Sequence, residues 1–273
     1  MMSVCRACCR APEPLPEESR GRRAVRPWTF LLLLVCLSGC PVTQPQGTPV
    51  PQVLQTEPNT GAKYWLYVPS TYKPDRAWPL AVTLHGTHGW DGADPQIREW
   101  KRLAEDKGFL VAAPELKSVQ GILPVVKGLW FKDLQDDERK VLAVIDAICD
   151  NYKVDRKTVL LTGFSAGGYP LYYIGLRNPQ RFLMLIARAC NSDIDLLESV
   201  KLTDETRKLP IVIYWGKDDL GPIQDQSWMA FRYLRERGFK LAEKEEFRGG
   251  HLRKPDLAYD YWAKHLPWRY RQQ

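Results

Sequence analysis

The sequence predicts an α/β fold in which helices cover both faces of a mostly parallel central sheet. Short apolar runs, typical of buried strands, alternate along the chain with longer segments whose apolar residues recur at helical spacing. A strand–helix–strand–helix–strand order precedes Ser165, and such an order folds as a parallel sheet with right-handed crossovers. In the segment Val159–Gly168, an apolar run ends in Gly-Phe-Ser-Ala-Gly, the pattern of a tight turn from a strand into a helix.

The elements before this turn follow from the period of apolar residues and from the residues that interrupt it. Lys63–Val68 alternates and is stopped by Pro69, whereas Leu80–Leu84 is continuously apolar, as in a strand buried on both faces. Gly108 can cap the helix that precedes it. We therefore expect strands at 63–68, 80–84, 109–113 and 159–162, and helices at 97–107 and 133–151.

The alternation continues after the turn. Pro170 lies in the first turn of the next expected helix, where a missing N–H costs least. Gly238 follows a further helical segment. We expect helices at 169–177, 228–237 and 254–266, and strands at 182–186, 211–215 and 239–247. The long connections 118–130 and 191–209 are the places where a lid could lie.

Ser165 is the candidate nucleophile. The small residues two before and two after it let the strand and the helix approach closely, so that the hydroxyl projects from the turn. The helix N-terminus beneath it favours developing negative charge. The five-residue pattern alone also fits an ordinary strand–turn–helix junction, so the remaining residues of the site decide the interpretation.

A candidate acid and a candidate base each follow a later strand. Asp219 comes after the strand 211–215, and His251 follows Gly-Gly after the last strand. In this arrangement the histidine takes the serine proton, and the carboxylate orients the imidazole and stabilises its charged form. Asp218 is the alternative to Asp219. A solvated loop histidine is the alternative interpretation of His251.

The loop after the strand 80–84 reads His-Gly-Thr-His-Gly. A glycine-containing loop at this place can supply one half of an oxyanion hole. The backbone N–H of Thr87 is the candidate donor, and the N–H of Ala166, directly after the nucleophile, is the other. A simple turn at the end of the strand is the alternative.

The N-terminus is typical of an export signal. Four arginines between residues 20 and 26 precede the short apolar run 28–37, and the run closes on Leu-Ser-Gly-Cys40, which resembles the lipobox of bacterial lipoproteins. We expect a signal peptide at 1–39, a lipidated Cys40 with a flexible tether at 40–60, and a catalytic domain at 61–273. The chain would then be lipid-anchored in the cell envelope, periplasmic or on the surface. A plain signal peptide with a coincidental cysteine is the alternative.

Composition argues against several other classes of protein. The net charge of +7 is scattered, without a basic stripe and interleaved aromatics, so a nucleic-acid partner is not expected. No run of twenty apolar residues predicts an ordinary membrane-spanning helix. No metal-ligand set and no dinucleotide or phosphate loop is evident, so we expect no cofactor. Cys149 and Cys190 could pair, but small buried apolar residues are the favoured interpretation.

From Tyr64 to Leu266 the chain resembles the α/β-hydrolase esterases that include polyhydroxybutyrate depolymerases and feruloyl esterases. The matching segments are Tyr67-Val-Pro69, Pro79–Gly86, Trp100–Ala104, Gly108–Pro114, Val154-Asp155, Thr158–Gly168 and Gly250-His251. The resemblance implies an α/β-hydrolase fold. Thr87 stands where many of these enzymes have cysteine, and Tyr169-Pro170 replaces the small or methionine residues common after the turn. Both departures concern the acyl-binding pocket.

The sequence therefore predicts a serine esterase that cleaves a carboxylic ester through an acyl-enzyme on Ser165. The substrate would be a small-molecule or polymer-derived ester, and the oligomeric state stays open. The aromatic candidates for an acyl site are Trp90, Trp130, Tyr169 and Trp215. A serine peptidase or amidase, and a catalytically silent ligand-binding lipoprotein, are the alternatives.

Overall fold

The computed structural model describes residues 52–119 and 127–271. These residues form an eight-stranded sheet in the order β1-β2-β4-β3-β5-β6-β7-β8. The strands from β3 to β8 run parallel, and β1 and β2 are antiparallel additions at the β4 edge. The strand bounds are β1 (Val53–Thr56), β2 (Lys63–Tyr67), β3 (Leu80–Leu84), β4 (Leu110–Pro114), β5 (Leu160–Ser165), β6 (Met184–Cys190), β7 (Ile211–Gly216) and β8 (Ala242–Phe247).

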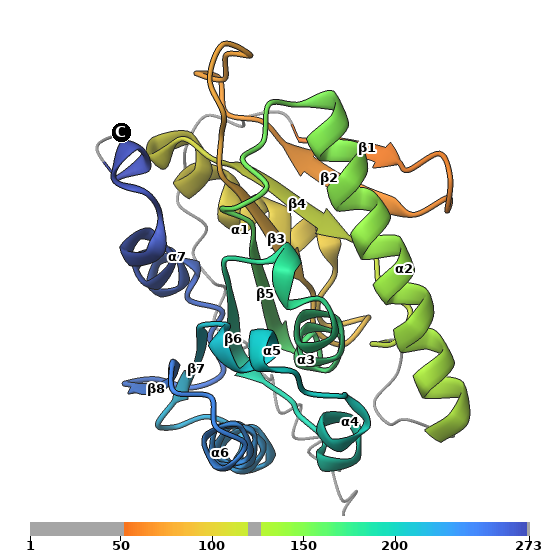
Figure 1. Cartoon of the computed structure of the whole chain (residues 1–273), viewed down its shortest axis with the longest axis vertical. Helices are drawn as coiled ribbons and strands as arrows, with labels where there is room; N and C mark the ends of the chain where they lie inside the picture. The colour runs from red at the N-terminus through yellow and green to blue at the C-terminus, as the bar shows by residue number, and fades with distance from the viewer. Residues whose placement is uncertain (1–51, 120–126, 272–273) are drawn as a thin grey trace, which may run out of the picture. The chain divides into compact units, whose positions relative to one another are not determined.

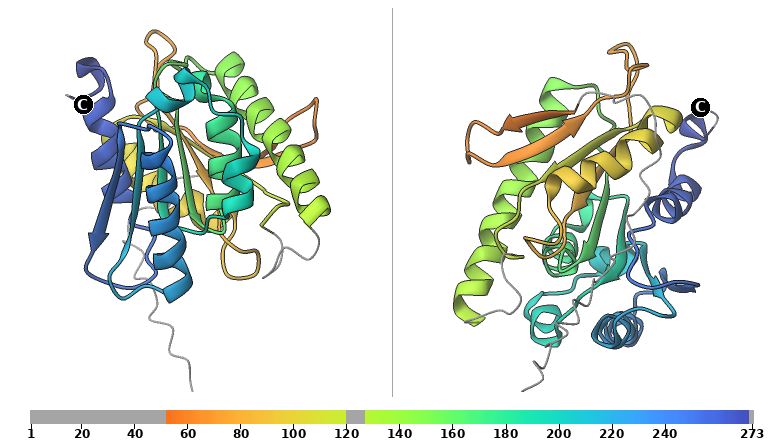
Figure 2. Two further views of the ribbon diagram at one scale, coloured as in Figure 1. Left: turned by 60° about the horizontal axis from the view of Figure 1, so that its bottom comes forward. Right: turned by 180° about the vertical axis from the view of Figure 1, so that it is seen from behind.

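Helices cover both faces of this sheet (Figures 1 and 2). The helices α1 and α7 pack on one face, and α2, α3 and α6 pack on the other. The short helices α4 and α5 lie in the connection between β6 and β7. The helix bounds are α1 (Ala93–Lys107), α2 (Lys127–Asn151), α3 (Gly168–Arg177), α4 (Ile194–Ser199), α5 (Asp204–Lys208), α6 (Gly221–Glu236) and α7 (Pro255–His265), with 3₁₀ turns at Pro179–Arg181 and Trp268–Tyr270.

The central strands are apolar at nearly every position because the sheet is buried on both faces. Every residue of β3, β4, β6 and β7 is buried. Successive residues of a strand point to opposite faces. Leu160 accordingly joins the apolar cluster on the α1/α7 face, and Leu161 joins the cluster on the other face. The predicted α/β class with a mostly parallel sheet is therefore confirmed.

Helix starts were the least accurate predictions. α1 begins at Ala93 rather than at 97, directly after the extended residue Gly92. α2 begins at Lys127, so part of the connection expected at 118–130 is helical, while residues 120–126 lie outside the described residues. α6 begins at Gly221 rather than at 228, because Pro222 fits the first turn of a helix.

Two strand boundaries also differ from the predictions. β6 begins at Met184 rather than at 182, because Phe182 still caps the preceding 3₁₀ turn, and it continues to Cys190. β8 begins only at Ala242, after a turn in which Gly238 has a φ of 89°. Both errors have one cause: an apolar residue in a turn resembles the first residue of a strand.

The strand β1 was not expected. Its residues fall within the span 40–60 that we expected to be a tether, so the structured part already includes Val53. The predictions at 1–39 and Cys40 lie outside the described residues. None of the described helices combines the length and the apolar character that crossing a bilayer requires.

Cys149 and Cys190, the two cysteines within the described residues, are unpaired. Cys190 is fully buried, donates from Sγ to the carbonyl of Gly163 at 3.1 Å, and has a pKa that burial raises to about 12. Cys149 is partly buried. The preferred interpretation of Cys190 as a small buried residue is confirmed.

Candidate active site

The predicted site residues lie at the carboxyl edge of the sheet. Ser165 is the last residue of β5, Asp219 lies in the turn between β7 and α6, and His251 lies in the loop between β8 and α7. Residues 85–92, which follow β3 and include Thr87, form what we call the oxyanion loop; residues 248–254 form the histidine loop. Because these strands are parallel, their carboxyl ends meet at one edge, where ligands of open α/β sheets bind.

Ser165 has a strained backbone. Its φ is 52°, in the left-handed region that a residue with a side chain rarely adopts. The flanking glycines make the turn possible: a Cβ on Gly163 would lie 2.5 Å from the carbonyl oxygen of Gly167, and a Cβ on Gly167 would lie 2.5 Å from the carbonyl oxygen of Leu84. The α3 helix begins at Gly168, so its N-terminus lies directly after this turn.

Asp219 and His251 are in direct contact. The Nδ1 atom of His251 lies 2.8 Å from Oδ1 of Asp219, whose side chain is fully buried. The backbone N–H of Leu220 also donates to this oxygen at 2.7 Å. The alternative acid, Asp218, has an exposed side chain. When Nδ1–H donates to the carboxylate, Nε2 is left as the proton acceptor of the imidazole.

The imidazole of His251 also packs against an aromatic ring. The ring centroids of His251 and Phe164 lie 4.6 Å apart, and the two planes are tilted by 35°. Phe164 directly precedes the candidate nucleophile in β5. The strand that ends at Ser165 therefore provides one of the surfaces against which the His251 imidazole packs.

The oxyanion loop is held by His85, a buried residue that the sequence analysis treated only as part of a turn. Its Nδ1 donates to the carbonyl of Gly86 at 2.8 Å, and its Nε2 accepts the N–H of Leu116 at 3.1 Å. Burial lowers the pKa of His85, in keeping with this neutral ring. In a trans peptide the N–H points away from the carbonyl. His85 therefore fixes the direction of the Thr87 N–H.

The two candidate oxyanion donors are free of protein acceptors. Within the part of the chain that the structure describes, neither the Thr87 nor the Ala166 amide donates to another residue. A Cβ on Gly86 would lie only 3.1 Å from Cβ of Ser165, so the oxyanion loop passes directly beside the candidate nucleophile. Both amides are consequently available to a ligand oxygen at this edge.

A buried polar network that the sequence analysis missed lies behind the two loops. Arg188 of β6 is fully buried and donates to Thr162 at 2.9 Å, to Thr83 at 2.8 Å and to Gln96 at 2.7 Å. Gln96 in turn donates to Asp91 at 2.8 Å. A single charged residue inside the apolar strand β6 was the available sequence signal.

The four aromatic candidates for an acyl site have different environments. Trp215 is fully buried against Trp228, so it cannot line a site. Trp130 and Tyr169 form an edge-to-face pair with centroids 5.0 Å apart, and Tyr169 lies in the first turn of α3. Trp90 in the oxyanion loop is 74% exposed.

Two further large apolar side chains are exposed on the loops of this edge. Leu220 directly follows Asp219, and Leu252 directly follows His251. Together with Trp90 they give all three loops an apolar, solvent-facing side chain. The connection 191–209, a candidate lid segment, contains the helices α4 and α5 instead of an extended loop.

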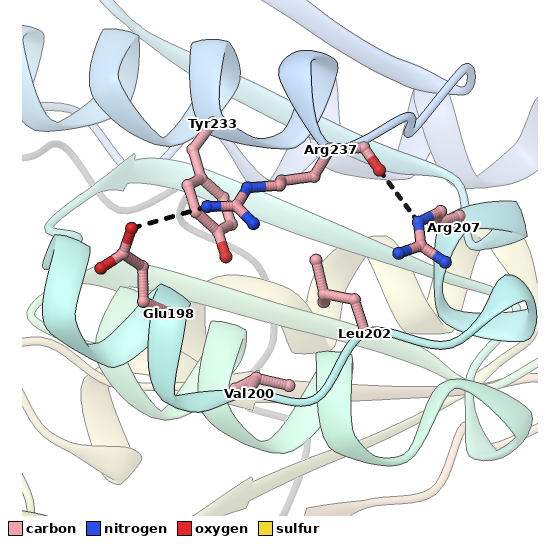
Figure 3. A pocket seen from close by; sticks show the side chains of 6 residues that line it. All are labelled: Glu198, Val200, Leu202, Arg207, Tyr233 and Arg237. Atoms are coloured by element: carbon pink, nitrogen blue, oxygen red, sulfur yellow. Dashed lines mark hydrogen bonds and ion pairs between the residues drawn. The ribbon is translucent and has the colours of Figure 1, made fainter.

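A cavity of about 300 Å³ lies elsewhere in the molecule (Figure 3). It is lined by Glu198, Val200, Leu202, Arg207, Tyr233 and Arg237. Arg237 pairs with Glu198 at 3.6 Å, and Arg207 donates to the Arg237 carbonyl at 3.0 Å. None of the predicted site residues lines this cavity, so it is no part of the candidate active site. Among the described residues, no three His, Cys, Asp or Glu side chains are grouped as metal ligands.

The chain is similar in sequence to known esterases. The model of the Esterase family, described as "Putative esterase", matches residues 56–267. The bifunctional acetylxylan esterase/xylanase XynS20E of Neocallimastix patriciarum is 30% identical over 119 residues, which is 43% of this chain and 16% of that protein. The matched segment is thus a small part of this relative.

Solved structures resemble the chain over most of its length. The CE1 ferulic acid esterase AmCE1/Fae1A of Anaeromyces mucronatus, without substrate, matches with a TM-score of 0.61 and 16% identity, covering 82% of this chain and 94% of that one. The S-formylglutathione hydrolase FrmB of Staphylococcus aureus matches with a TM-score of 0.58 and 14% identity, covering 80% and 98%. At such identities the likeness concerns the fold, and the predicted α/β-hydrolase fold is confirmed.

Proposed function

The chain belongs to the Esterase family, and from this premise we propose that it is a serine-dependent carboxylic ester hydrolase whose catalytic residues are Ser165, Asp219 and His251. The observation that carries the proposal is the 2.8 Å contact between His251 and the buried carboxylate of Asp219. This contact lies at the same edge of the sheet as a serine held with a φ of 52°. An oriented base at the same edge of the sheet as a serine with a strained backbone is the combination that nucleophilic catalysis uses.

The proposed reaction has two halves. In the first, Ser165 Oγ attacks the ester carbonyl carbon while Nε2 of His251 takes the hydroxyl proton. The C–O bond to the alcohol then breaks, and His251 returns the proton to the leaving oxygen, which leaves an acyl-enzyme. In the second, His251 takes a proton from water, the hydroxide attacks the acyl carbon, and Ser165 recovers its proton as the acid leaves. Asp219 stabilises the imidazolium in both halves.

The negative oxygen of each tetrahedral intermediate would accept hydrogen bonds from the Thr87 and Ala166 amides. Both amides lack a protein acceptor among the described residues, which supports this role. The Gly86–Thr87 peptide is held by His85, so the donor is fixed before substrate arrives. Preorganised donors of this kind commonly provide the largest single contribution to catalysis.

The substrate class follows from the surroundings of the site. We propose an ester of a small or aromatic acid, small-molecule or polymer-derived, with the acyl group near the Trp130–Tyr169 pair and the alcohol side near Trp90. The names of the two similar proteins, an acetylxylan esterase and a ferulic acid esterase, support acyl groups of these two sizes. Neither a peptidase nor a silent binding protein is favoured by these relatives.

The N-terminal proposal stands on the sequence alone. We propose that residues 1–39 are an export signal and that Cys40 is lipidated, which would attach the enzyme to the cell envelope. Metabolic labelling with a palmitate analogue, on the wild type and on Cys40→Ala, tests this. We expect labelling of the wild type only.

The test of the catalytic proposal is covalent labelling of the full chain with a fluorophosphonate. We expect one label per chain, lost in Ser165→Ala and retained in Ser70→Ala, which removes an exposed serine bonded only to Glu105 among the described residues. Hydrolysis of p-nitrophenyl acetate and methyl ferulate should follow the same pattern. A folded wild type that neither labels nor hydrolyses these esters would refute the proposal.

A further inference from the structure

We propose that Asp91 is a positioning residue that fixes the oxyanion loop against the histidine loop through an ion pair with Arg253. The inference rests on the proposed function. Oδ2 of Asp91 accepts the backbone N–H of Gly86 at 2.7 Å, and Oδ1 accepts Nη2 of Arg253 at 2.8 Å. One carboxylate thus joins two loops that are 162 residues apart in the sequence. We call this contact the loop tie.

On its first side the loop tie restrains the candidate oxyanion donor. The Asp91 carboxylate holds the N–H of Gly86, and the Asp91 backbone N–H donates to the carbonyl of Thr87 at 3.0 Å. The peptide groups on either side of the Gly86–Thr87 peptide are therefore both bonded to one residue. A shift of Asp91 would carry the Thr87 amide with it.

On its second side the loop tie restrains the candidate base. Arg253 is two residues beyond His251, and its carbonyl accepts the hydroxyl of Tyr214 at 3.3 Å and Nη1 of Arg188 at 3.4 Å. Its guanidinium lies 5.2 Å from the ring centroid of Phe164, which packs against His251. Arg253 therefore fixes the histidine loop through its backbone and the imidazole wall through its side chain.

Burial distinguishes the loop tie from an ordinary surface ion pair. The side chain of Asp91 is 4% exposed and that of Arg253 is 21% exposed. The second acid near Arg253, Glu99, is farther away at 3.8 Å. A buried charge that loses its partner is strongly unfavourable. The two loops are consequently held together more firmly than solvent-screened charges would hold them.

The loop tie spans the two halves of the proposed machinery, with the Thr87 donor on one side and the His251 base on the other. An error of about 1 Å in such an arrangement can cost on the order of a hundredfold in rate. Since Asp91 does not touch the substrate in this scheme, its loss should weaken transition-state stabilisation while leaving ground-state binding in place.

The test compares Asp91→Asn with Asp155→Asn in the full chain. Asp155 is a matched control, because it also accepts a backbone N–H, from Lys157, and pairs with an arginine, Arg269, but it precedes β5 at the opposite end of the sheet. For p-nitrophenyl acetate we expect kcat to fall about tenfold to a hundredfold in Asp91→Asn with an almost unchanged KM, and to stay at the wild-type value in Asp155→Asn.

A transition-state analogue provides a second measurement that a merely structural role would not move. We expect the affinity for a trifluoromethyl ketone, which forms a tetrahedral oxyanion on the serine, to fall by the same factor as kcat/KM. Equal losses in both variants, an unchanged kcat in Asp91→Asn, or a loss confined to KM would each overturn the inference.

If Asp91→Asn does not fold, Arg253→Lys carries the test. This variant keeps the cation but loses the guanidinium geometry, and we expect the same loss in kcat at a smaller factor. An unchanged kcat in folded Arg253→Lys would overturn the inference. A wild type without activity would refute the proposed function as well, whereas an active wild type with fully active variants would refute the loop tie alone.

Discussion

The two edges of the sheet each carry an aspartate that pairs with an arginine from late in the chain. At the carboxyl edge the loop tie joins Asp91 and Arg253 at 2.8 Å, with side chains 4% and 21% exposed. At the amino edge Asp155 and Arg269 lie 2.6 Å apart, with side chains 13% and 56% exposed. In both pairs an arginine Nη2 atom contacts an aspartate oxygen, but the arginine of the amino-edge pair is the more exposed.

The molecule concentrates desolvated charge and backbone strain at the carboxyl edge of the sheet. Exposed pairs contribute little to stability, whereas buried charges depend on their partner. Backbone strain follows the same division: among the described residues, the non-glycine residues with positive φ are Ser165, Ala189 and Lys254, and each of them lies at the carboxyl edge. Strain and desolvated charge gather where function is proposed.

The largest expected effect tests the acid at the carboxyl edge. We expect Asp219→Asn to lower kcat by roughly 10³–10⁴-fold, because the amide cannot orient the imidazole or stabilise its charged form. Asp218→Asn is the matched control, since its side chain is exposed and its backbone N–H donates to Gly249 in either variant. Steady-state hydrolysis of p-nitrophenyl acetate measures both. A greater loss of kcat in Asp218→Asn would mean that Asp218, and not Asp219, is the carboxylate that orients His251.

The next effect concerns strain at the carboxyl edge. Glycine adopts a φ of 52° without strain, whereas alanine does not. We expect Ser165→Gly to have a free energy of unfolding about 1 kcal/mol above that of Ser165→Ala, measured by urea denaturation. The amino-edge control is Lys157, which has no positive φ, so Lys157→Gly should be less stable than Lys157→Ala. If the glycine variant were more stable than the alanine variant at both positions, or less stable at both, backbone strain would not distinguish the two edges.

A third effect tests the buried histidine of the oxyanion loop. Burial lowers the pKa of His85 in the folded chain below its ordinary value of 6.5. As the pH falls below 6.5, the unfolded chain binds a proton that the folded chain does not, so the stability contributed by His85 is present above this pH and is lost towards the lowered pKa. Urea denaturation from pH 8 to pH 5 should show the stability difference between wild type and His85→Asn shrinking. A constant difference would contradict the prediction.

The smallest effect belongs to the amino-edge pair. We expect Arg269→Gln to change the free energy of unfolding only slightly, and less still at 1 M salt, because solvent and ions screen an exposed pair. The rate of ester hydrolysis should equal that of the wild type. A loss of activity would mean that the amino edge communicates with the site.

The strands were predictable because burial on both faces leaves a continuous apolar run. Leu80–Leu84 was predicted with its observed bounds, and the helix end was predicted from Gly108, which caps α1 in a left-handed conformation. Helix starts were less predictable, since α1 and α6 both lack a side-chain cap and both have a proline in the first turn. A first turn that contains proline and has no cap residue resembles a loop in the sequence.

The site was predictable only where chemistry leaves a local pattern. Ser165 has a glycine two residues before it and another two residues after it, and His251 follows Gly-Gly, so both were found from the sequence. Their catalytic roles stay predictions. The Asp91–Arg253 contact has no such pattern, because it depends on two loops that meet only in the folded chain. The network behind these loops was missed, although Arg188, a charged residue within an apolar strand, was an available sequence signal.

The position of β8 near the end of the chain affects when the site can be completed during synthesis. It is the last strand in the sheet order, it pairs with β7, and His251 follows it. The ribosome delivers residues in sequence, at about 5–20 per second. The proposed nucleophile, Ser165, is therefore synthesised several seconds before the proposed base, His251, exists. Under the proposed mechanism, the Ser165 hydroxyl of a newly made chain would stay unactivated until β8 docks, and the order of synthesis would delay ester hydrolysis until the fold is complete.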